Sequence, residues 1–173
     1  MNITIRRALP ADAADMAEIL SRSWEAAYKN IIPAEYISEK NATRLALFRR
    51  IVTGEDTGHC VIEKGGKSIG IMWVGPPKQE SHVDTDDIDD SFYELHSLYI
   101  HPDFWRQGIG SEAMEFAVSR ARSAGKRNII LWVFAENTGT ISFYEKCGFT
   151  ADGAYKLYNC GRELKAIRMR LAL

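Results

Sequence analysis

The chain has 173 residues, 46% of them hydrophobic, which suits one domain with an ordinary buried core. Its 22 Lys and Arg are balanced by 23 Asp and Glu, so no basic surplus is available to bind nucleic acid or an anionic membrane. No apolar run approaches the roughly 20 residues that span a bilayer, and the N-terminal segment lacks the apolar core of a signal peptide. We therefore expect a single cytoplasmic domain over residues 1–173, with no nucleic-acid partner and no membrane partner.

The first third of the sequence predicts one short strand and then helices. Ile3 and Ile5 alternate as in a strand, and apolar side chains then recur at helical spacing. The segment from Asn30 to Pro33 interrupts this spacing. The expected helices cover residues 10–28, 34–39 and 42–53.

The remaining sequence predicts strands with two helices among them. Gly65 and Gly66 form a hairpin turn, because both positions tolerate a positive φ, and residues 159–162 form a second turn. The order of elements favours a single mixed α/β fold without internal repeats. The expected strands cover residues 59–64, 68–74, 92–100, 128–134, 154–158 and 164–170, and the expected helices cover residues 111–123 and 140–146.

The cysteines do not form a metal-binding or disulfide pattern. Cys60, Cys147 and Cys160 are an odd and scattered set, without the close pairing of a zinc site, so we expect reduced thiols and no metal. Cys147 has no histidine close to it in the sequence that would act as a base. A packing role is therefore favoured over a nucleophilic one.

The stretch from Tyr93 to Ser111 is typical of a strand, a polar loop and a helix start. Gly108 and Gly110 have no Cβ, so backbone N–H groups can converge on an anion at the positive end of the helix. The pattern predicts a loop that binds a pyrophosphate. The same glycines with Ala113 also satisfy the dinucleotide pattern G-x-G-x-x-A, which leaves a nicotinamide-dependent oxidoreductase as an alternative. Residues 101–107 between strand and turn disfavour that alternative.

A second motif follows the apolar run 129–134. It starts at Asn137, reads N-x-x-x-I-x-F-Y-E-K-x-G-F, and ends at Phe149. The glycine turn with its helix, the strand and this motif, in that order and spacing, resemble the GCN5-related N-acetyltransferase (GNAT) family. The resemblance is specific over residues 92–149 and only architectural before them. It implies a mostly antiparallel mixed sheet that is splayed between two central parallel strands, with helices on both faces.

The resemblance also implies acetyl-CoA as co-substrate. Its pyrophosphate would bind the amides of the glycine loop, and its pantetheine arm would run along the strand 92–100. Asn137 would contact the arm as it leaves, or would instead cap its helix. Trp105 departs from the family, which often has Arg or Gln at that position. The implied cofactor-binding residues are Leu98, Tyr99, Ile100, Arg106, Gln107, Gly108, Ile109, Gly110, Ser111, Asn137 and Tyr144.

Acetyl transfer from a thioester to an amine needs a neutral amine, a polarised carbonyl group and a proton for the thiolate. The resemblance makes Tyr144 the acid, with packing in the helix core as its alternative role. A backbone N–H near Leu98 or Tyr99 would hold the carbonyl oxygen. For the base, strand alternation places Glu94 and His96 on one face. Glu94 stands fourteen residues before Gly108, the spacing of the general-base glutamate in the histone-acetylating branch of the family. Alternatively, Glu94 and His96 only form hydrogen bonds to a neighbouring strand, and a chain of water molecules deprotonates the amine.

Acceptor recognition in the family comes largely from the first helices and the last hairpin. Trp24 and Tyr28 lie four residues apart and either line an acceptor pocket or pack in the core, and Glu94 is a further candidate contact. The acidic segment 80–90 is either a solvated linker or a rim that attracts a cationic acceptor.

We therefore expect an N-acetyltransferase in which a primary amine attacks acetyl-CoA directly in a ternary complex. A small cationic amine or polyamine ranks first as acceptor, and a peptide N-terminus or lysine ranks second. A non-catalytic acyl-CoA-binding regulatory module remains an alternative. The exposed edges of such a sheet would also allow a homodimer.

Overall fold

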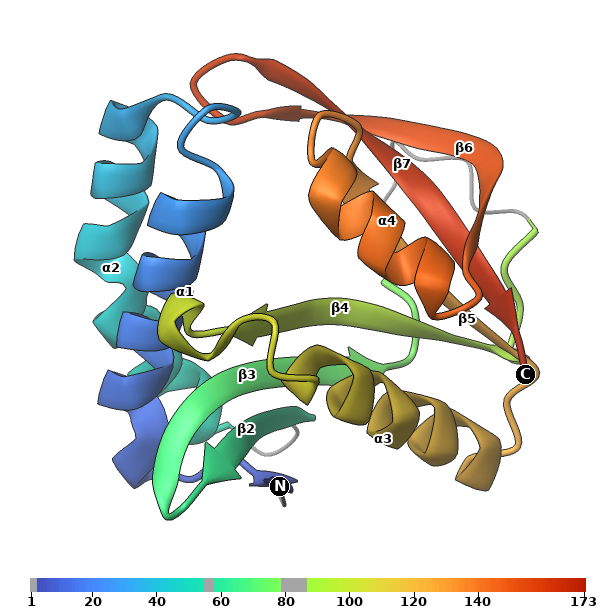
Figure 1. Ribbon diagram of the computed structural model, residues 1–173, viewed down its shortest axis with the longest axis horizontal. Coiled ribbons are helices and arrows are strands. Elements are labelled where there is room, and N and C mark those ends of the chain that lie inside the picture. The colour runs from blue at the N-terminus through green and yellow to red at the C-terminus, as the bar shows by residue number, and fades with distance from the viewer. Residues whose placement is uncertain (1–2, 55–57, 79–86) are drawn as a thin grey trace. The chain divides into compact units, whose positions relative to one another are not determined.

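The computed structural model describes residues 3–54, 58–78 and 87–173. These residues form two compact units. The first contains Met1–Trp73 and Ser97–Ala113, and the second contains Val74–His96 and Met114–Leu173. Among the described residues, strand β3 (Lys67–Gly75), strand β4 (Phe92–Ile100) and helix α3 (Ile109–Ser123) have residues in both units. All three are labelled in Figure 1.

The strands form a seven-stranded sheet in the order β1-β2-β3-β4-β5-β7-β6. β4 pairs in parallel with β5 (Asn128–Phe134), from Phe92 opposite Asn128 to Glu94 opposite Ile130. This pairing stops there, although β4 continues to Ile100 and β5 to Phe134. The pairs β1–β2, β2–β3, β5–β7 and β6–β7 are antiparallel. The expected mixed, mostly antiparallel α/β fold is confirmed, and it is not the parallel sheet of a dinucleotide-binding fold.

In the first unit, two helices pack on a short antiparallel sheet. Helices α1 and α2 lie side by side (Figure 1) and contribute Met16, Ile19 and Phe48 to a core that also contains Val61 and Ile71 of the strands. Met16 and Val61 are fully buried, so the apolar positions at helical spacing do face the core. The remaining elements of this unit are β1 (Thr4–Arg7), η1 (Pro10–Asp12), α1 (Ala13–Ala27), α2 (Ala34–Val52), β2 (His59–Lys64) and η2 (Pro102–Phe104).

Helix α2 is continuous from Ala34 to Val52, so the expectation of two separate helical pieces was wrong. Neither Lys40 nor Asn41, between the expected pieces, breaks a helix as Pro or Gly would. The amide nitrogen of Asn41 donates to Glu25 Oε1 on α1 at 2.9 Å. The Asn41 side chain therefore bonds to the neighbouring helix and does not compete for the backbone of its own. In the described part of the chain, no helix combines the length and apolar character that a membrane crossing requires.

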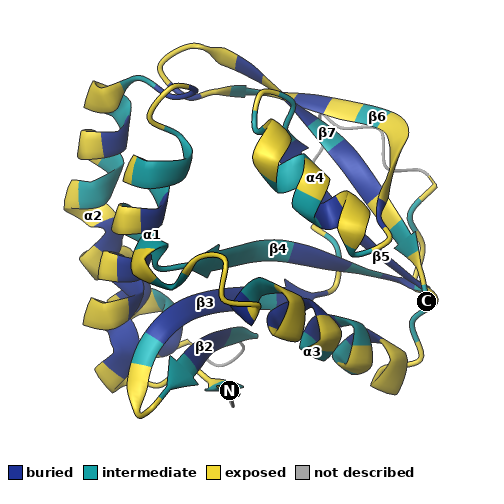
Figure 2. Ribbon diagram, in the orientation of Figure 1, coloured by how far each residue is buried: buried dark blue, intermediate teal, exposed yellow. Residues whose placement is uncertain are grey.

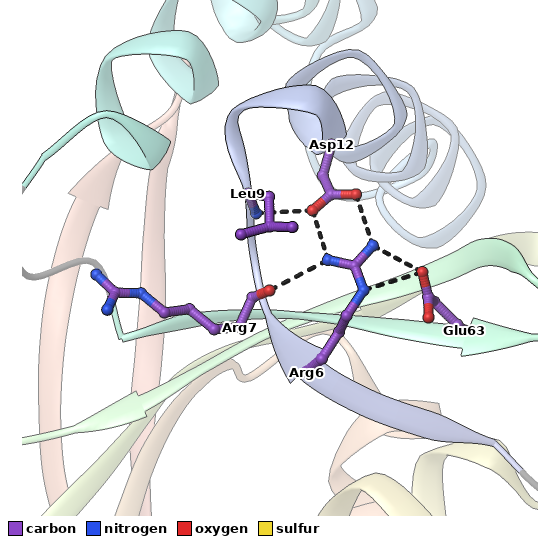
Figure 3. Close-up of polar contacts among 5 residues, drawn as sticks. All are labelled: Arg6, Arg7, Leu9, Asp12 and Glu63. Carbon is purple, nitrogen blue, oxygen red and sulfur yellow. Dashed lines mark hydrogen bonds and ion pairs between the residues drawn. The ribbon is translucent and has the colours of Figure 1, made fainter.

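An ion-pair cluster joins β1, η1 and β2 (Figure 3). Arg6 donates to both carboxylate oxygens of Asp12, at 2.7 and 2.8 Å, and to Glu63 Oε1 at 2.7 and 3.1 Å. Asp12 also accepts the backbone N–H of Leu9 at 2.7 Å. Hydrogen bonding from Arg6 holds the pKa of Asp12 below its ordinary value. The cluster thus connects the first turn of the helical region to two strands.

The second unit is built around β5. Ile129, Ile130 and Leu131 are consecutive and almost fully buried, so both faces of this strand are covered. β7 pairs with β5 and is buried at many positions, whereas β6 is exposed over much of its length (Figure 2). The remaining elements of this unit are α4 (Thr138–Lys146), β6 (Thr150–Asn159) and β7 (Glu163–Ala172).

Arg168 on β7 is buried and pairs with two aspartates. Its guanidinium donates to Asp152 at 2.6 Å and to both oxygens of Asp87, at 2.9 and 2.5 Å. Hydrogen bonding from Arg168 lowers the pKa of Asp87. Asp87 belongs to the acidic segment 80–90, and residues 80–86 lie outside the described residues. One aspartate of that segment is thus engaged in a structural ion pair.

Candidate active site

The loop between β4 and α3 has a backbone suited to anion binding. Gly108 has φ 80° and Arg106 has φ 58°, both in the left-handed region. Helix α3 begins at Ile109, two residues before the expected start. The carbonyl of Gly108 accepts the N–H groups of Ser111 and Glu112, at 3.0 and 3.2 Å. The amides that precede Ser111 therefore remain for an anion at the positive end of the helix.

Gly110 has a different role from Gly108. It lies in the first turn of α3 and has no positive φ, so only Gly108 needs the conformational freedom of glycine in this turn. Because glycine has no side chain, the backbone of the first turn of α3 carries no Cβ at position 110.

Lysine side chains lie beside this loop, and sequence reasoning missed them. Lys64 Nζ, at the end of β2, donates to Gln107 Oε1 at 2.8 Å, and Gln107 Nε2 donates to the carbonyl of Asp103 at 3.1 Å. Lys64 and Lys67 both lie over the Phe104 ring, at 5.8 and 5.9 Å from its centroid. They add positive charge near the predicted phosphate-binding turn. No local motif signals this role, because Lys64 is 43 residues from Gln107 in the chain.

Trp105, which departs from the family pattern, bonds to the backbone at the end of β4. Its indole Nε1 donates to the carbonyl of Ile100 at 2.6 Å, and Ser23 Oγ on α1 donates to the same oxygen at 3.0 Å. Both acceptor positions of that carbonyl are thus used within the protein. If pantetheine contacts the backbone of Ile100, as the sequence predicts, the contact would use its N–H.

Glu94 and His96 contact each other on one face of β4. His96 Nδ1 lies 3.1 Å from Glu94 Oε1, and the two side chains are 5% and 9% exposed. His96 Nε2 lies 2.9 Å from the carbonyl oxygen of Pro76, and Glu94 Oε2 accepts the N–H of Lys78 at 3.2 Å. Both ring nitrogens of His96 thus face oxygen atoms, Nδ1 the Glu94 carboxyl group and Nε2 the Pro76 carbonyl. The pair thus brings together an imidazole and a carboxyl group, two side-chain types that act as general bases in enzymes.

Tyr144 and Asn137 lie in and beside α4. Tyr144 is buried, with its ring centroid 5.3 Å from that of Phe143 and 5.8 Å from that of Phe149. The Tyr144 ring thus packs in the core, as the alternative role expected. The role of its hydroxyl as an acid stays a prediction. Asn137 Oδ1 accepts the N–H of Thr140 at 3.4 Å and so caps the helix. This contact uses the amide oxygen, and a ligand contact would use the amide nitrogen.

Trp24 and Tyr28 form an edge-to-face pair on α1, with ring centroids 5.3 Å apart and planes at 88°. The guanidinium of Arg44 on α2 stacks on the Trp24 ring, 4.5 Å from its centroid. Arg44 is 3% exposed, and sequence reasoning did not select it. The buried positions of α2 are Ile37, Arg44, Phe48 and Val52, so helical spacing would have placed Arg44 on the buried face of one continuous helix.

The structure also bears on the Cys147 thiol and on groups of metal-ligating side chains. Burial raises the pKa of the Cys147 thiol, which disfavours the nucleophilic thiolate. Over residues 3–54, 58–78 and 87–173, no group of three or more His, Cys, Asp and Glu side chains is placed to hold a metal ion.

The predicted site residues are distributed over both units. Within the second unit, Glu94 contacts His96 directly. The first unit contains Trp24, Tyr28, Leu98, Tyr99, Ile100, Arg106, Gln107, Gly108, Ile109, Gly110 and Ser111, and the second contains Glu94, His96, Asn137 and Tyr144.

Two solved acetyltransferase structures are similar to the chain. The PaiA N-acetyltransferase of Thermoplasma acidophilum, solved in complex with coenzyme A, superposes with a TM-score of 0.76 at 20% identity, over 100% of both chains. YncA of Salmonella typhimurium, solved with its cofactor acetyl-CoA, has a TM-score of 0.65 at 26% identity, over 100% of this chain and 95% of that one. The first likeness shows the fold.

Sequence comparison identifies the family. MJ1207, an uncharacterised N-acetyltransferase of Methanocaldococcus jannaschii, is 27% identical over 151 residues, which are 84% of this chain and 60% of the relative. The chain thus spans about 60% of the length of that relative. Residues 14–149 match the acetyltransferase (GNAT) family, a match that includes the glycine turn and the α4 motif. The chain therefore belongs to the GNAT family of acetyltransferases.

Proposed function

We propose that the chain is an N-acetyltransferase that transfers the acetyl group of acetyl-CoA to a primary amine. The observation that carries this proposal is the family match over residues 14–149, together with the left-handed glycine turn at the start of α3. The amine attacks acetyl-CoA directly in a ternary complex.

The first unit has groups that suit the pyrophosphate of acetyl-CoA. The amides of residues 107–110 precede the first bonded N–H groups of α3. The side chain of Arg106 and the ammonium group of Lys64 supply positive charge at the same loop. A diphosphate is recognised well by such a combination of amides and cations. The pantetheine arm would bond to the backbone of β4 beyond Glu94, where the parallel pairing with β5 ends.

In the reaction, the amine nitrogen attacks the acetyl carbon, a C–N bond forms and the C–S bond breaks. The Glu94–His96 pair accepts the proton that the amine loses, directly or through water, because carboxylate and imidazole are side-chain types suited to a general base and the two lie in contact. The hydroxyl of Tyr144 gives its proton to the departing thiolate. The one proton lost by nitrogen and the one gained by sulfur balance, so the products are an amide and the free CoA thiol.

Release of CoA thiol with a panel of primary amines tests the proposal. We expect thiol release that depends on the amine. Tyr144→Phe keeps the ring packing and should lower kcat about a hundredfold, with the KM for acetyl-CoA unchanged. Glu94→Gln should lower kcat by a similar factor and change its pH dependence.

The exposed Tyr155 provides a matched control, since Tyr155→Phe removes a hydroxyl of the same kind outside the proposed chemistry. Acetyl-CoA binding without thiol release from any amine would favour the regulatory binding module instead. Unchanged turnover of both active-site variants across pH would remove Tyr144 and Glu94 from the mechanism.

A further inference from the structure

Three buried polar atoms between α1 and α2 have no hydrogen-bond partner within the described residues. They are Trp24 Nε1, Asn41 Oδ1 and Arg44 Nη1. The Arg44 guanidinium lies 4.5 Å from the Trp24 ring centroid, and Asn41 is one helical turn before Arg44 on α2. Buried polar groups in folded proteins are nearly always hydrogen-bonded, so three unpaired atoms on two helices that pack together call for a partner.

The unpaired groups include a buried cation. Burial lowers the pKa of Arg44 to about 10, and a group with that pKa is still charged at neutral pH. The nearby carboxylate of Glu25 accepts hydrogen bonds from Asn41 and Arg22, at 2.9 and 3.2 Å. Glu25 acts electrostatically on Arg44, but within the described part of the chain Arg44 Nη1 has no hydrogen-bond partner and no carboxylate contacts the guanidinium in an ion pair. The Trp24 ring contacts its face but offers no acceptor for its N–H groups.

The cluster lies beside the strand residues that are proposed to bind acetyl-CoA. Tyr99 packs against the core formed by α1 and α2, and its phenol acts electrostatically on Arg44. Ser23, one residue before Trp24, bonds to the carbonyl of Ile100 at 3.0 Å and so holds α1 against the end of β4. An acceptor bound at Arg44 would therefore lie on the side of β4 to which the Tyr99 side chain points, and the backbone N–H of Tyr99 is proposed to hold the thioester carbonyl.

We propose that Arg44 Nη1 and Trp24 Nε1 bind a carboxylate of the acceptor, and that Asn41 Oδ1 accepts an N–H or O–H of the same molecule. Two N–H donors, one of them cationic, match a carboxylate, and the direction of the Asn41 amide is set by its bond to Glu25. The acceptor class is then a small amine that carries a carboxylate, such as a free amino acid. This inference rests on the proposed N-acetyltransferase function and names its acceptor.

The inference changes the order of acceptors expected from the sequence. Cationic amines and polyamines ranked first there because of the acidic segment 80–90, but Asp87 of that segment is paired with Arg168. A buried guanidinium would repel a polyamine. A carboxylate supplies the missing charge and the missing acceptor together.

The test compares free amino acids with their carboxamides, which keep the amine and remove the carboxylate charge. Thiol release from acetyl-CoA is measured for each pair. For the best pair we expect kcat/KM at least about tenfold higher for the acid, the value of one charge-assisted hydrogen bond. Equal kcat/KM across all pairs, or a preference for carboxamides or polyamines, would overturn the inference.

Variants assign the effect to the cluster. Arg44→Gln should raise the KM for the amino acid about tenfold or more, and leave the KM for acetyl-CoA and the kinetics of the carboxamide unchanged. Trp24→Phe keeps the stacked ring and removes only the N–H, so a smaller rise of about threefold in the same KM is expected. Arg50→Gln, an exposed arginine on the same helix, is the control. If Arg44→Gln fails to fold, Arg44→Lys and Trp24→Phe decide.

Calorimetric binding of an N-acetylated amino acid separates this inference from the proposed function. This probe carries the carboxylate and needs no turnover. If the probe binds, and if Arg44→Gln and Trp24→Phe both weaken its binding, the carboxylate site is supported. This holds even if no amine releases thiol, because the absence of thiol release would contradict only the proposed acetyl transfer. Binding that neither variant weakens would mean that Arg44 has a structural role, and the carboxylate site would be refuted.

Discussion

Gly108 is the residue at which backbone conformation and proposed function meet most directly. Its φ of 80° lies in the left-handed region, and a Cβ added there would meet no atom within 4 Å. A larger side chain would therefore be disfavoured by the backbone conformation alone, without a steric clash. Gly125, which follows α3, has φ 71° and equally open space.

Gly108→Ala should lower the free energy of unfolding by about 1 kcal/mol, the cost of a left-handed non-glycine residue. It should also raise the Kd for acetyl-CoA several-fold, because the strained turn relaxes away from the shape that directs its amides at the diphosphate. Denaturant unfolding and calorimetry measure the two effects.

Gly125→Ala is the matched control for this residue, since it should show the same loss of stability with no change in acetyl-CoA binding. A Gly108→Ala variant with unchanged Kd would show that the turn does not bind the diphosphate.

Some residues of the candidate site could be selected from the sequence and others could not. Gly108, Tyr144 and the pair Glu94 and His96 could be selected from motifs and strand alternation. Arg44 was not selected although it lies four residues before Phe48 within the expected helix 42–53, because an arginine is seldom buried and does not count toward an apolar face. Dividing α2 into two pieces did leave Asn41 outside both of them, and so hid its contact with Glu25.

At the scale of elements, Arg6 and Asp12 connect β1 to the start of the helical region (Figure 3). The pKa of Asp12 in the folded protein is lower than its ordinary value, because of the hydrogen bonds from Arg6. A carboxylate with a lowered folded pKa contributes stability that is present above its unfolded pKa. This contribution is lost as the pH falls through the folded pKa.

Asp12→Asn should therefore destabilise the protein by about 2 kcal/mol at pH 7, the value of hydrogen bonds to a charged group. The difference from the unsubstituted protein should shrink as the pH is lowered below the ordinary carboxyl pKa of about 4, where Asp12 is progressively protonated. Urea unfolding at a series of pH values measures it.

Glu39→Gln serves as the comparison for this element, because Glu39 is 71% exposed and its removal should be nearly neutral at every pH. A difference for Asp12→Asn that stays constant down to pH 2 would show that the carboxylate charge is not what stabilises η1.

At the scale of the whole molecule, binding of acetyl-CoA should be visible as added stability. A ligand that binds only the folded state at about a hundred times its Kd raises the free energy of unfolding by about 2.7 kcal/mol. We expect acetyl-CoA and CoA to raise Tm in a concentration-dependent manner, and NAD at equal concentration to leave it unchanged. Thermal unfolding followed by fluorescence measures this shift.

Gly108→Ala should reduce the shift that acetyl-CoA produces, and Gly125→Ala should not. A rise in Tm with NAD and none with CoA would contradict both the proposed co-substrate and the proposed function.

The amino-acid sequence by itself determined the order of strands and helices, the glycine turn and the α4 motif. These features depend on local properties, such as side-chain periodicity, the freedom of glycine and capping, which short segments carry wherever they lie. They were sufficient to predict a single mixed α/β fold and to show the resemblance to the family, and that resemblance implied the central parallel pair. The continuity of α2 and the earlier start of α3 were missed, because side-chain periodicity does not define the residue at which a helix begins or ends.

Only the tertiary structure decided which distant side chains meet. Ser23 and Ile100 are 77 residues apart, and Asp87 and Arg168 are 81 apart. The unpaired cluster around Arg44 likewise exists only because α1 packs against α2. The physical reason is that partner choice depends on how buried faces pack and on which polar groups that packing leaves without water, and neither is written in the order of residues.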